Sequence, residues 1–382
     1  MCKILINGLL LNNNFSGVQY YTENLIKALG SIEKAEIKYD VLLSNIYEGK
    51  IQSNQIVNKI NCGFDTTNRI RRIFFENFKL QNWYKNKHYH LYHSPSYILP
   101  YNWGYPSVLT IHDLIALDFP EFCRSESAKY FDFFLPRSIK KANCIIAVSN
   151  KVKEDIIKHF RIDPDKINVI YHGIADTFLK IEAIDKLSRV KKLYHLPDNY
   201  ILFVGNIEPK KNLERLICAF KLLRNTHKLD HKLVIAGKKG WKYNTVFRTI
   251  EELEISDKVI FTGYVPEEDL PVIYSMSDLF VFPSLYEGFG IPPLEAMACE
   301  VPVLVSNKGA LPEVTGGKCL QIDPYNVGEI AEGMYKLLTD IELRDRSIQQ
   351  GKEWVKHFSW EKAAIETYMV YKQTIQNNET GI

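Results

Sequence analysis

Phe282-Pro-Ser-Leu-Tyr-Glu-Gly-Phe-Gly-Ile-Pro-Pro-Leu-Glu-Ala-Met-Ala298 is the most informative stretch of the chain. The apolar run that ends at Phe282 predicts a buried strand. Two glycines in the middle predict a loop whose backbone can approach a ligand closely. The pair Pro292–Pro293 then predicts the start of a helix, because proline suits the first helical turn. Strand, glycine-bearing loop and helix together indicate an α/β ligand site.

Two glutamates flank the predicted start of this helix. We expect Glu287 in the loop and Glu295 in the first turn of the helix. Free backbone N–H groups and the positive end of the helix dipole lie between them and suit a phosphate group. Carboxylates repel phosphate, so they are better explained as acceptors for hydroxyls on either side of a diphosphate. The pattern favours a nucleotide-sugar site over a plain turn with solvated carboxylates.

Glu287 and Glu295, with seven residues between them, resemble the Glu-x7-Glu motif of the retaining glycosyltransferases of family 4. The segment Tyr286-Glu-Gly-Phe-Gly290 is typical of the bacterial, mannosyltransferase-like branch. The resemblance covers most of the chain. It implies an α/β fold of GT-B type, with two Rossmann-like parallel-sheet domains facing each other across a cleft. It also implies a nucleotide-sugar donor, contacted by Gly288, Phe289, Gly290 and Glu295, and no required metal or other cofactor.

Length and composition exclude several other classes. The 382 residues exceed one typical core, and 46% of them are hydrophobic, so two globular domains are expected. The net charge of +3 gives no indication of nucleic-acid binding. Seven scattered cysteines without a Cys-x-x-Cys pair suggest neither disulfides nor a zinc site. We find no signal peptide and no membrane-spanning run, and therefore expect a cytoplasmic protein, peripheral at most on the inner face of the plasma membrane.

Strands and helices alternate along the chain, and the pattern restarts near residue 200. We take the polar segment 176–199 as a linker. The predicted domains are 1–180, which would bind the acceptor, and 181–360, which would bind the nucleotide sugar. Residues 361–382 are predicted as a C-terminal helix. In GT-B enzymes this helix returns to the first domain.

Two positions of the first domain are candidate site residues. Gly17 ends a loop after the first strand, and it matches a family glycine that lies near the donor phosphates. His112 follows the predicted strand 107–111, at the carboxyl edge of the sheet where ligands bind. Histidine exchanges a proton near neutral pH, and the family histidine lies against the donor sugar. The alternatives are a plain turn at Gly17 and a turn-capping role for His112.

Residues 69–87 are basic and rich in aromatic side chains. They predict an amphipathic helix that either contacts an anionic membrane or packs with its basic face in water. His88, His90 and His93 follow. We interpret them as structural, because no carboxylate stands at ligand spacing.

The loop after the predicted strand 201–204 carries lysines just ahead of a helix capped by Asn212. Lysines in this place can meet a diphosphate. In the family, the lysine that matches Lys211 contacts the donor phosphates. Asn206 stands where one branch has arginine, which puts one phosphate contact in doubt.

The resulting prediction is a metal-independent hexosyltransferase that retains the configuration of the anomeric carbon. His112 and Glu287 are its predicted catalytic residues. We expect a saccharide or lipid-linked acceptor in surface polysaccharide or lipopolysaccharide synthesis, with a weak preference for GDP-mannose as donor. A nucleotide-sugar epimerase and a non-catalytic subunit that binds sugar nucleotides are the alternatives. An assay for turnover of the donor alone separates the epimerase from the transferase.

Overall fold

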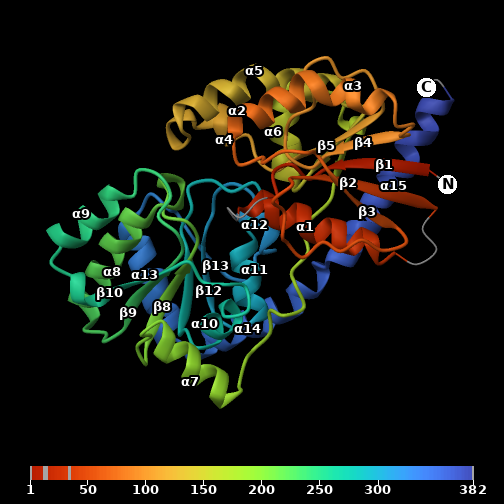
Figure 1. The fold of residues 1–382 in the computed structure, drawn as a ribbon. Helices are drawn as coiled ribbons and strands as arrows, with labels where there is room; N and C mark the ends of the chain where they lie inside the picture. Colours follow the sequence, from red (N-terminus) through yellow and green to blue (C-terminus); the bar gives the residue numbers. More distant parts are fainter. Residues whose placement is uncertain (1, 12–15, 33–35, 381–382) are drawn as a thin grey trace. The chain divides into compact units, whose positions relative to one another are not determined.

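The computed structural model describes residues 2–11, 16–32 and 36–380, which form two compact units (Figure 1). Unit 1 comprises residues 1–173 and 358–382, and unit 2 comprises residues 174–357. Each is a parallel sheet with helices on its faces, as the alternating pattern predicts. The central strands of each sheet are almost completely buried, which explains why they appear in the sequence as continuous apolar runs. Two Rossmann-like parallel sheets confirm the predicted fold class.

The described residues of unit 1 contain a sheet in the order β3-β2-β1-β4-β5-β6-β7. Its strands are β1 (Cys2–Asn7), β2 (Ile37–Leu43), β3 (Val57–Asn61), β4 (Leu91–Ser94), β5 (Ser107–Ile111), β6 (Cys144–Ala147) and β7 (Ile167–Val169). Its helices are α1 (Gly17–Gly30), α2 (Arg69–Phe74), the π turn η1 (Phe75–Lys79), α3 (Leu80–Lys85), α4 (Ile115–Asp118), α5 (Ser125–Lys141), α6 (Asn150–Phe160) and α15 (Trp360–Glu379), with 3₁₀ turns at Pro120–Phe122 and Pro164–Lys166.

The described residues of unit 2 contain a second sheet in the order β10-β9-β8-β11-β12-β13. Its strands are β8 (Tyr200–Val204), β9 (Lys232–Ala236), β10 (Val259–Gly263), β11 (Leu279–Phe282), β12 (Val303–Ser306) and β13 (Leu320–Ile322). Its helices are α7 (Ile184–Leu193), α8 (Leu213–His227), α9 (Asn244–Glu252), α10 (Leu270–Ser275), α11 (Ile291–Ala298), α12 (Leu311–Val314), α13 (Val327–Thr339) and α14 (Ile341–Trp354), with 3₁₀ turns η4 (Pro209–Lys211), η5 (Ser256–Lys258) and η6 (Val355–His357).

The segment predicted as a linker belongs to unit 2 instead. It contains the helix α7, whose Arg189 forms an ion pair with Asp269 just before α10. Ahead of α7, the backbone N–H of Ile181 donates to Ser275 at the end of α10. These contacts tie the segment to unit 2. The units divide at Gly173 and Phe358, where the sequence predicts boundaries at 180 and 360. The prediction of a linker is wrong because α7 buries only Val190, so its sequence is nearly as polar as that of a linker.

The last helix, α15, is part of unit 1. Its Tyr371 lies 2.6 Å from Nδ1 of His93, and Nε2 of the same imidazole lies 2.8 Å from the Thr110 hydroxyl. Burial lowers the pKa of His93 to about 3, so this ring stays neutral. His90 instead accepts from the backbone N–H of Lys3, so the two histidines do not share a site.

Two features are absent from residues 2–11, 16–32 and 36–380. No group of three histidine, cysteine or acidic side chains there is placed to hold a metal ion. No helix there is both long and apolar enough to cross a bilayer.

Candidate active site

The candidate site of unit 2 lies where the order of its strands reverses. β8 and β11 are hydrogen-bonded neighbours, while the chain continues from β8 to β9 on one side and from β11 to β12 on the other. Ligands of open α/β sheets bind outside the carboxyl ends of the strands at such a point. The loops that follow these two strands are joined: the N–H of Leu285 donates to Lys210 O at 2.8 Å. Together they carry the predicted donor-binding residues Asn206, Lys211 and Gly288–Gly290.

Lys211 and Glu287 form a buried ion pair across these two loops. Lys211 Nζ lies 2.6 Å from Glu287 Oε1, and Lys210 Nζ lies 3.7 Å from Oε2. Burial lowers the pKa of Lys211, an effect that the Glu287 charge opposes. Burial alone would raise the pKa of Glu287, but the charges of Lys210 and Lys211 hold it below its ordinary value. The 2.6 Å contact is that of an ion pair in which each charge offsets the burial of the other.

Asn212 joins three loops instead of capping α8. We expected its side chain to cap the helix, but at the N-cap position it makes no such bond. Its Nδ2 donates to Pro283 O at 3.1 Å and to Pro324 O at 2.7 Å. Its backbone is left-handed, with φ at 59°, a region that asparagine tolerates. A short polar side chain with this backbone fixes the Lys211 loop against the loop after β11.

The loop Gly288–Gly290 leads into α11 as predicted. Gly290 is the N-cap, and its φ of 95° suits glycine. Phe289 is buried. Gly309, which no motif in the sequence marks, has a φ of 62°, and a Cβ there would lie 2.7 Å from Glu287 O. The next residue, Ala310, donates its N–H to that carbonyl at 2.9 Å, so the loop after β12 supports the Glu287 backbone.

Glu295 lies deeper than predicted. α11 begins at Ile291, which places Glu295 in its second turn and not in the first. The carboxyl is buried and accepts a 2.9 Å hydrogen bond from the Tyr274 hydroxyl of α10. Burial raises its pKa to about 8, and the charge of Glu267 adds to the effect. Glu295 is therefore mostly a neutral acid at pH 7.

Asn206 is exposed and directly follows Gly205 in the Lys211 loop. Gly17 is the first residue of α1, and a Cβ there would meet no atom within 4 Å. Glycine at position 17 is thus not required by packing. The rest of the predicted loop, residues 12–15, lies outside the described residues.

His112 lies at the carboxyl end of β5 in unit 1, as predicted. Its Nε2 is 2.8 Å from Pro95 O, and because a carbonyl only accepts, Nε2 carries the proton. Burial lowers the pKa of His112, so the neutral ring keeps Nδ1 as an acceptor. The ring meets Tyr21 edge-on at 4.7 Å between centroids. The environment fixes one tautomer and one orientation.

Known proteins resemble both halves of the chain. Residues 15–178 match the family described as Glycosyltransferase Family 4, and residues 185–354 match Glycosyl transferases group 1. O-antigen chain mannosyltransferase B of Escherichia coli is 32% identical over 283 residues, which cover 74% of each chain.

Solved structures share the fold. Sucrose-phosphate synthase of Thermosynechococcus elongatus superimposes with a TM-score of 0.76 at 22% identity, over 98% of this chain and 99% of that one. HepE of Anabaena, in complex with UDP and glucose, gives 0.73 at 16% identity, over 98% of this chain and 100% of that one.

Proposed function

Because this chain belongs to glycosyltransferase family 4 and has the GT-B fold, it is a glycosyltransferase, and we propose that it transfers a hexose from a nucleotide sugar to a saccharide or lipid-linked saccharide. The lysine pair beside Glu287, at the point where the unit 2 strand order reverses, carries this proposal. The name of the E. coli relative supports mannose as the sugar and surface polysaccharide or lipopolysaccharide as the product. We propose GDP-mannose as the donor.

The proposed roles follow from the chemistry of the residues. Lys211 and the N–H groups at the start of α11 would bind the diphosphate and stabilise its charge as it departs. On donor binding, Lys211 would leave its ion pair with Glu287 and bind the phosphate instead. Glu287 would then stay beside Lys210 and could accept a hydrogen bond from a sugar hydroxyl. We propose that the acceptor oxygen bonds to the anomeric carbon on the face that the diphosphate leaves, so configuration is retained. The acceptor proton passes to the departing phosphate oxygen.

We propose that the reaction needs no metal or other cofactor, since Lys210 and Lys211 supply positive charge at the diphosphate. Thermal-shift titration with GDP, UDP and ADP, followed by their sugars, identifies the donor. NMR of the product then shows the anomeric configuration, and the assay is repeated in EDTA. If the protein converts the donor into another nucleotide sugar when no acceptor is present, this result would favour the epimerase. Activity that EDTA abolishes and Mg²⁺ restores would contradict metal independence.

We expect His112→Ala to lower kcat by about 10²-fold, the range of a positioned polar catalytic group. The Nδ1 lone pair would accept from a donor-sugar hydroxyl, and the interaction would strengthen in the transition state. Nucleotide affinity should change little, since the ion pair and Glu295 belong to unit 2. Steady-state kinetics beside nucleotide titration test this, with the exposed His90→Ala as control. A near wild-type kcat would remove His112 from the site.

We also propose that the protein is cytoplasmic and touches an anionic membrane through unit 1. Phe74 and Phe78 are 53% and 54% exposed, with ring centroids 5.5 Å apart. The ring of Phe78 packs beside that of Tyr101, which in turn stacks with the ring of Phe133. The guanidinium of Arg137 lies over the rings of Tyr101 and Phe133. Exposed aromatic rings beside cations are typical of interfacial surfaces.

Phe74→Ser/Phe78→Ser should weaken sedimentation with phosphatidylglycerol-containing vesicles about tenfold, since two apolar side chains no longer enter the interface. Ile341→Ser is the control, because Ile341 is 62% exposed in unit 2. Equal loss in both variants, or no binding of the wild type at low salt, would exclude this surface.

A further inference from the structure

Unit 1 has its own point where the strand order reverses. β1 and β4 are neighbours, with β2 and β3 on one side and β5, β6 and β7 on the other. Asn7 and Ser94 are the last residues of these two strands. By the same rule that locates the site of unit 2, a ligand of unit 1 binds outside these strand ends. The polar side chains gathered there indicate which ligand this is.

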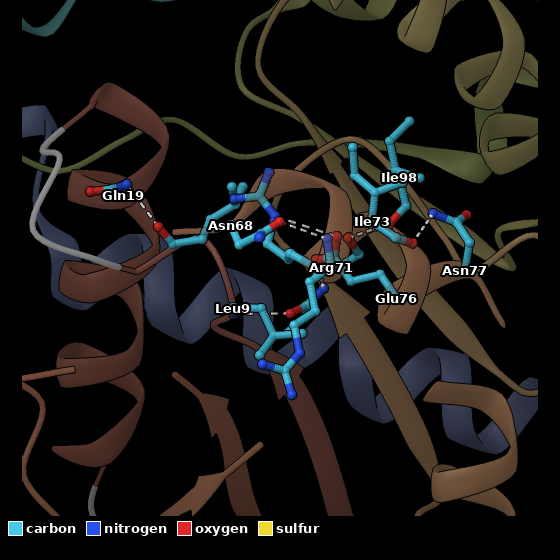
Figure 2. A network of polar contacts seen from close by, with 12 residues as sticks. Leu9, Gln19, Asn68, Arg71, Ile73, Glu76, Asn77 and Ile98 are labelled. Carbon is cyan, nitrogen blue, oxygen red and sulfur yellow. Dashed lines mark hydrogen bonds and ion pairs between the residues drawn. The ribbon is translucent and has the colours of Figure 1, made fainter. Parts of the chain in front are cut away.

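Glu76 reaches this point from the broken helix over residues 69–85. Asn7 Nδ2 donates to Glu76 Oε1 at 3.1 Å, while the N–H of Leu9 donates to Asn7 Oδ1 at 3.0 Å (Figure 2). The second bond fixes the orientation of the amide, and hence that of the carboxyl. The Glu76 side chain is 15% exposed, so it is mostly enclosed yet keeps access to solvent.

Arg72 lies beside this carboxyl without completing a hydrogen bond. Its Nε is 3.7 Å from Glu76 Oε2, which is too long for one. The same Nε is buried and has no other hydrogen-bond partner. Buried N–H groups in folded proteins are nearly always paired, so an unpaired one needs an explanation. A guanidinium donor and a carboxyl acceptor thus lie side by side with hydrogen-bonding capacity left over.

The π turn places Glu76 in this position. The helix that begins at Arg69 changes at Phe75 to a wider turn and returns to α-helix at Leu80. π turns are rare within helices and are frequent at functional sites. Around Glu76, the neighbouring Asn77 Nδ2 donates to Ile73 O, as Figure 2 shows. The π turn therefore contains Glu76, the one acidic residue of this helix.

We propose that Glu76, oriented by Asn7 and paired with Arg72, binds a hydroxyl group of a neutral pyranoside, the acceptor in the reaction proposed above. A sugar hydroxyl donates and accepts at once, which suits an acceptor and a donor standing together. An anionic ligand is less suited to this site than a neutral one, because Glu76 already offsets the charge of Arg72. The inference rests on the proposed function only in calling this ligand the acceptor.

Saturation-transfer NMR with methyl α-D-mannopyranoside tests the site in the full chain without a donor. The wild type should bind the probe saturably. Glu76→Ala should raise its Kd about tenfold to a hundredfold, because a hydrogen bond to a charged group is lost. Glu76→Gln keeps one oxygen acceptor and should fall between the two. Glu126→Gln, an exposed acid of α5 in the same unit, should bind as the wild type does.

Melting temperatures and GDP titrations accompany each variant. A Glu76→Gln protein that melts and binds GDP like the wild type but binds the probe more weakly supports the inference, even where the Ala variant does not fold. Unchanged probe affinity in the Gln variant, or no saturable binding by the wild type, overturns it. Failure of the proposed transferase would show separately, as absence of nucleotide-sugar turnover with mannoside binding intact.

Discussion

Lys211→Met is expected to lower the free energy of unfolding by about 3–5 kcal/mol, because it leaves the buried Glu287 carboxylate without its direct partner. Removing one member of a buried pair costs far more than the pair contributes, since the remaining charge is desolvated. Lys210 Nζ, 3.7 Å from Glu287 Oε2, remains as a weaker counter-charge. We therefore expect a loss of unfolding free energy near the lower end of this range. Affinity for a nucleoside diphosphate should fall about tenfold to a hundredfold with the loss of a charged donor.

Denaturant unfolding and GDP titration measure the two effects. Lys210→Met is the matched control and should cost about 1 kcal/mol or less, since its ion pair is long and partly exposed. Lys211→Met/Glu287→Gln should regain much of the lost stability, because no carboxylate is then buried alone. GDP affinity should not recover in the double variant. If it did, Lys211 would act only on Glu287 and not on phosphate.

The second large effect concerns the pH dependence of stability at Glu295. The carboxyl ionises near 4.5 in the unfolded chain and near 8 in the folded one. A pKa raised by folding gives stability that is complete below about pH 4.5 and is lost as pH rises toward 8. The full loss is about 5 kcal/mol. Glu295→Gln cannot ionise, so its stability should lack this component.

Urea unfolding of both proteins from pH 4 to 9 measures the difference directly. Glu268→Gln, an exposed acid just before α10, is the control and should leave the wild-type curve unchanged. Parallel curves for wild type and Glu295→Gln would show that the buried carboxyl does not control stability. If ribose hydroxyls donate to the ionised carboxylate, GDP affinity of the wild type should also rise with pH over this range.

Much of the fold could be predicted because parallel strands buried on both faces are apolar throughout. The edge strand β3 was missed, since Val57-Asn-Lys-Ile-Asn61 is mostly exposed and polar. The helix α7 was missed for a similar reason, because its polar surface resembles a linker. Apolar periodicity identifies an element only where the element buries one face.

The positions of Lys211 and Glu287 on turns between strand and helix could be predicted from local spacing. Their pairing could not, because it depends on which strands are neighbours, and β8 and β11 are far apart in the sequence. The neutral state of Glu295 depends on Tyr274 and on burial, which no local pattern encodes. Glu76 could not be identified as a candidate from the sequence, because it lies in a basic stretch. Its position in the π turn and its hydrogen bond with Asn7 are visible only in the structure.

Unit 1 is built from two separate pieces of chain, and this affects the order in which the protein can fold during synthesis. Unit 2 is continuous and is complete once residue 357 has left the ribosome. Unit 1 begins earlier but stays without its last helix until Tyr371 arrives to meet His93. Nascent unit 1 therefore leaves the contact surface of α15 uncovered for the time needed to translate residues 174–357. At about 5–20 residues per second this interval lasts roughly ten seconds or more.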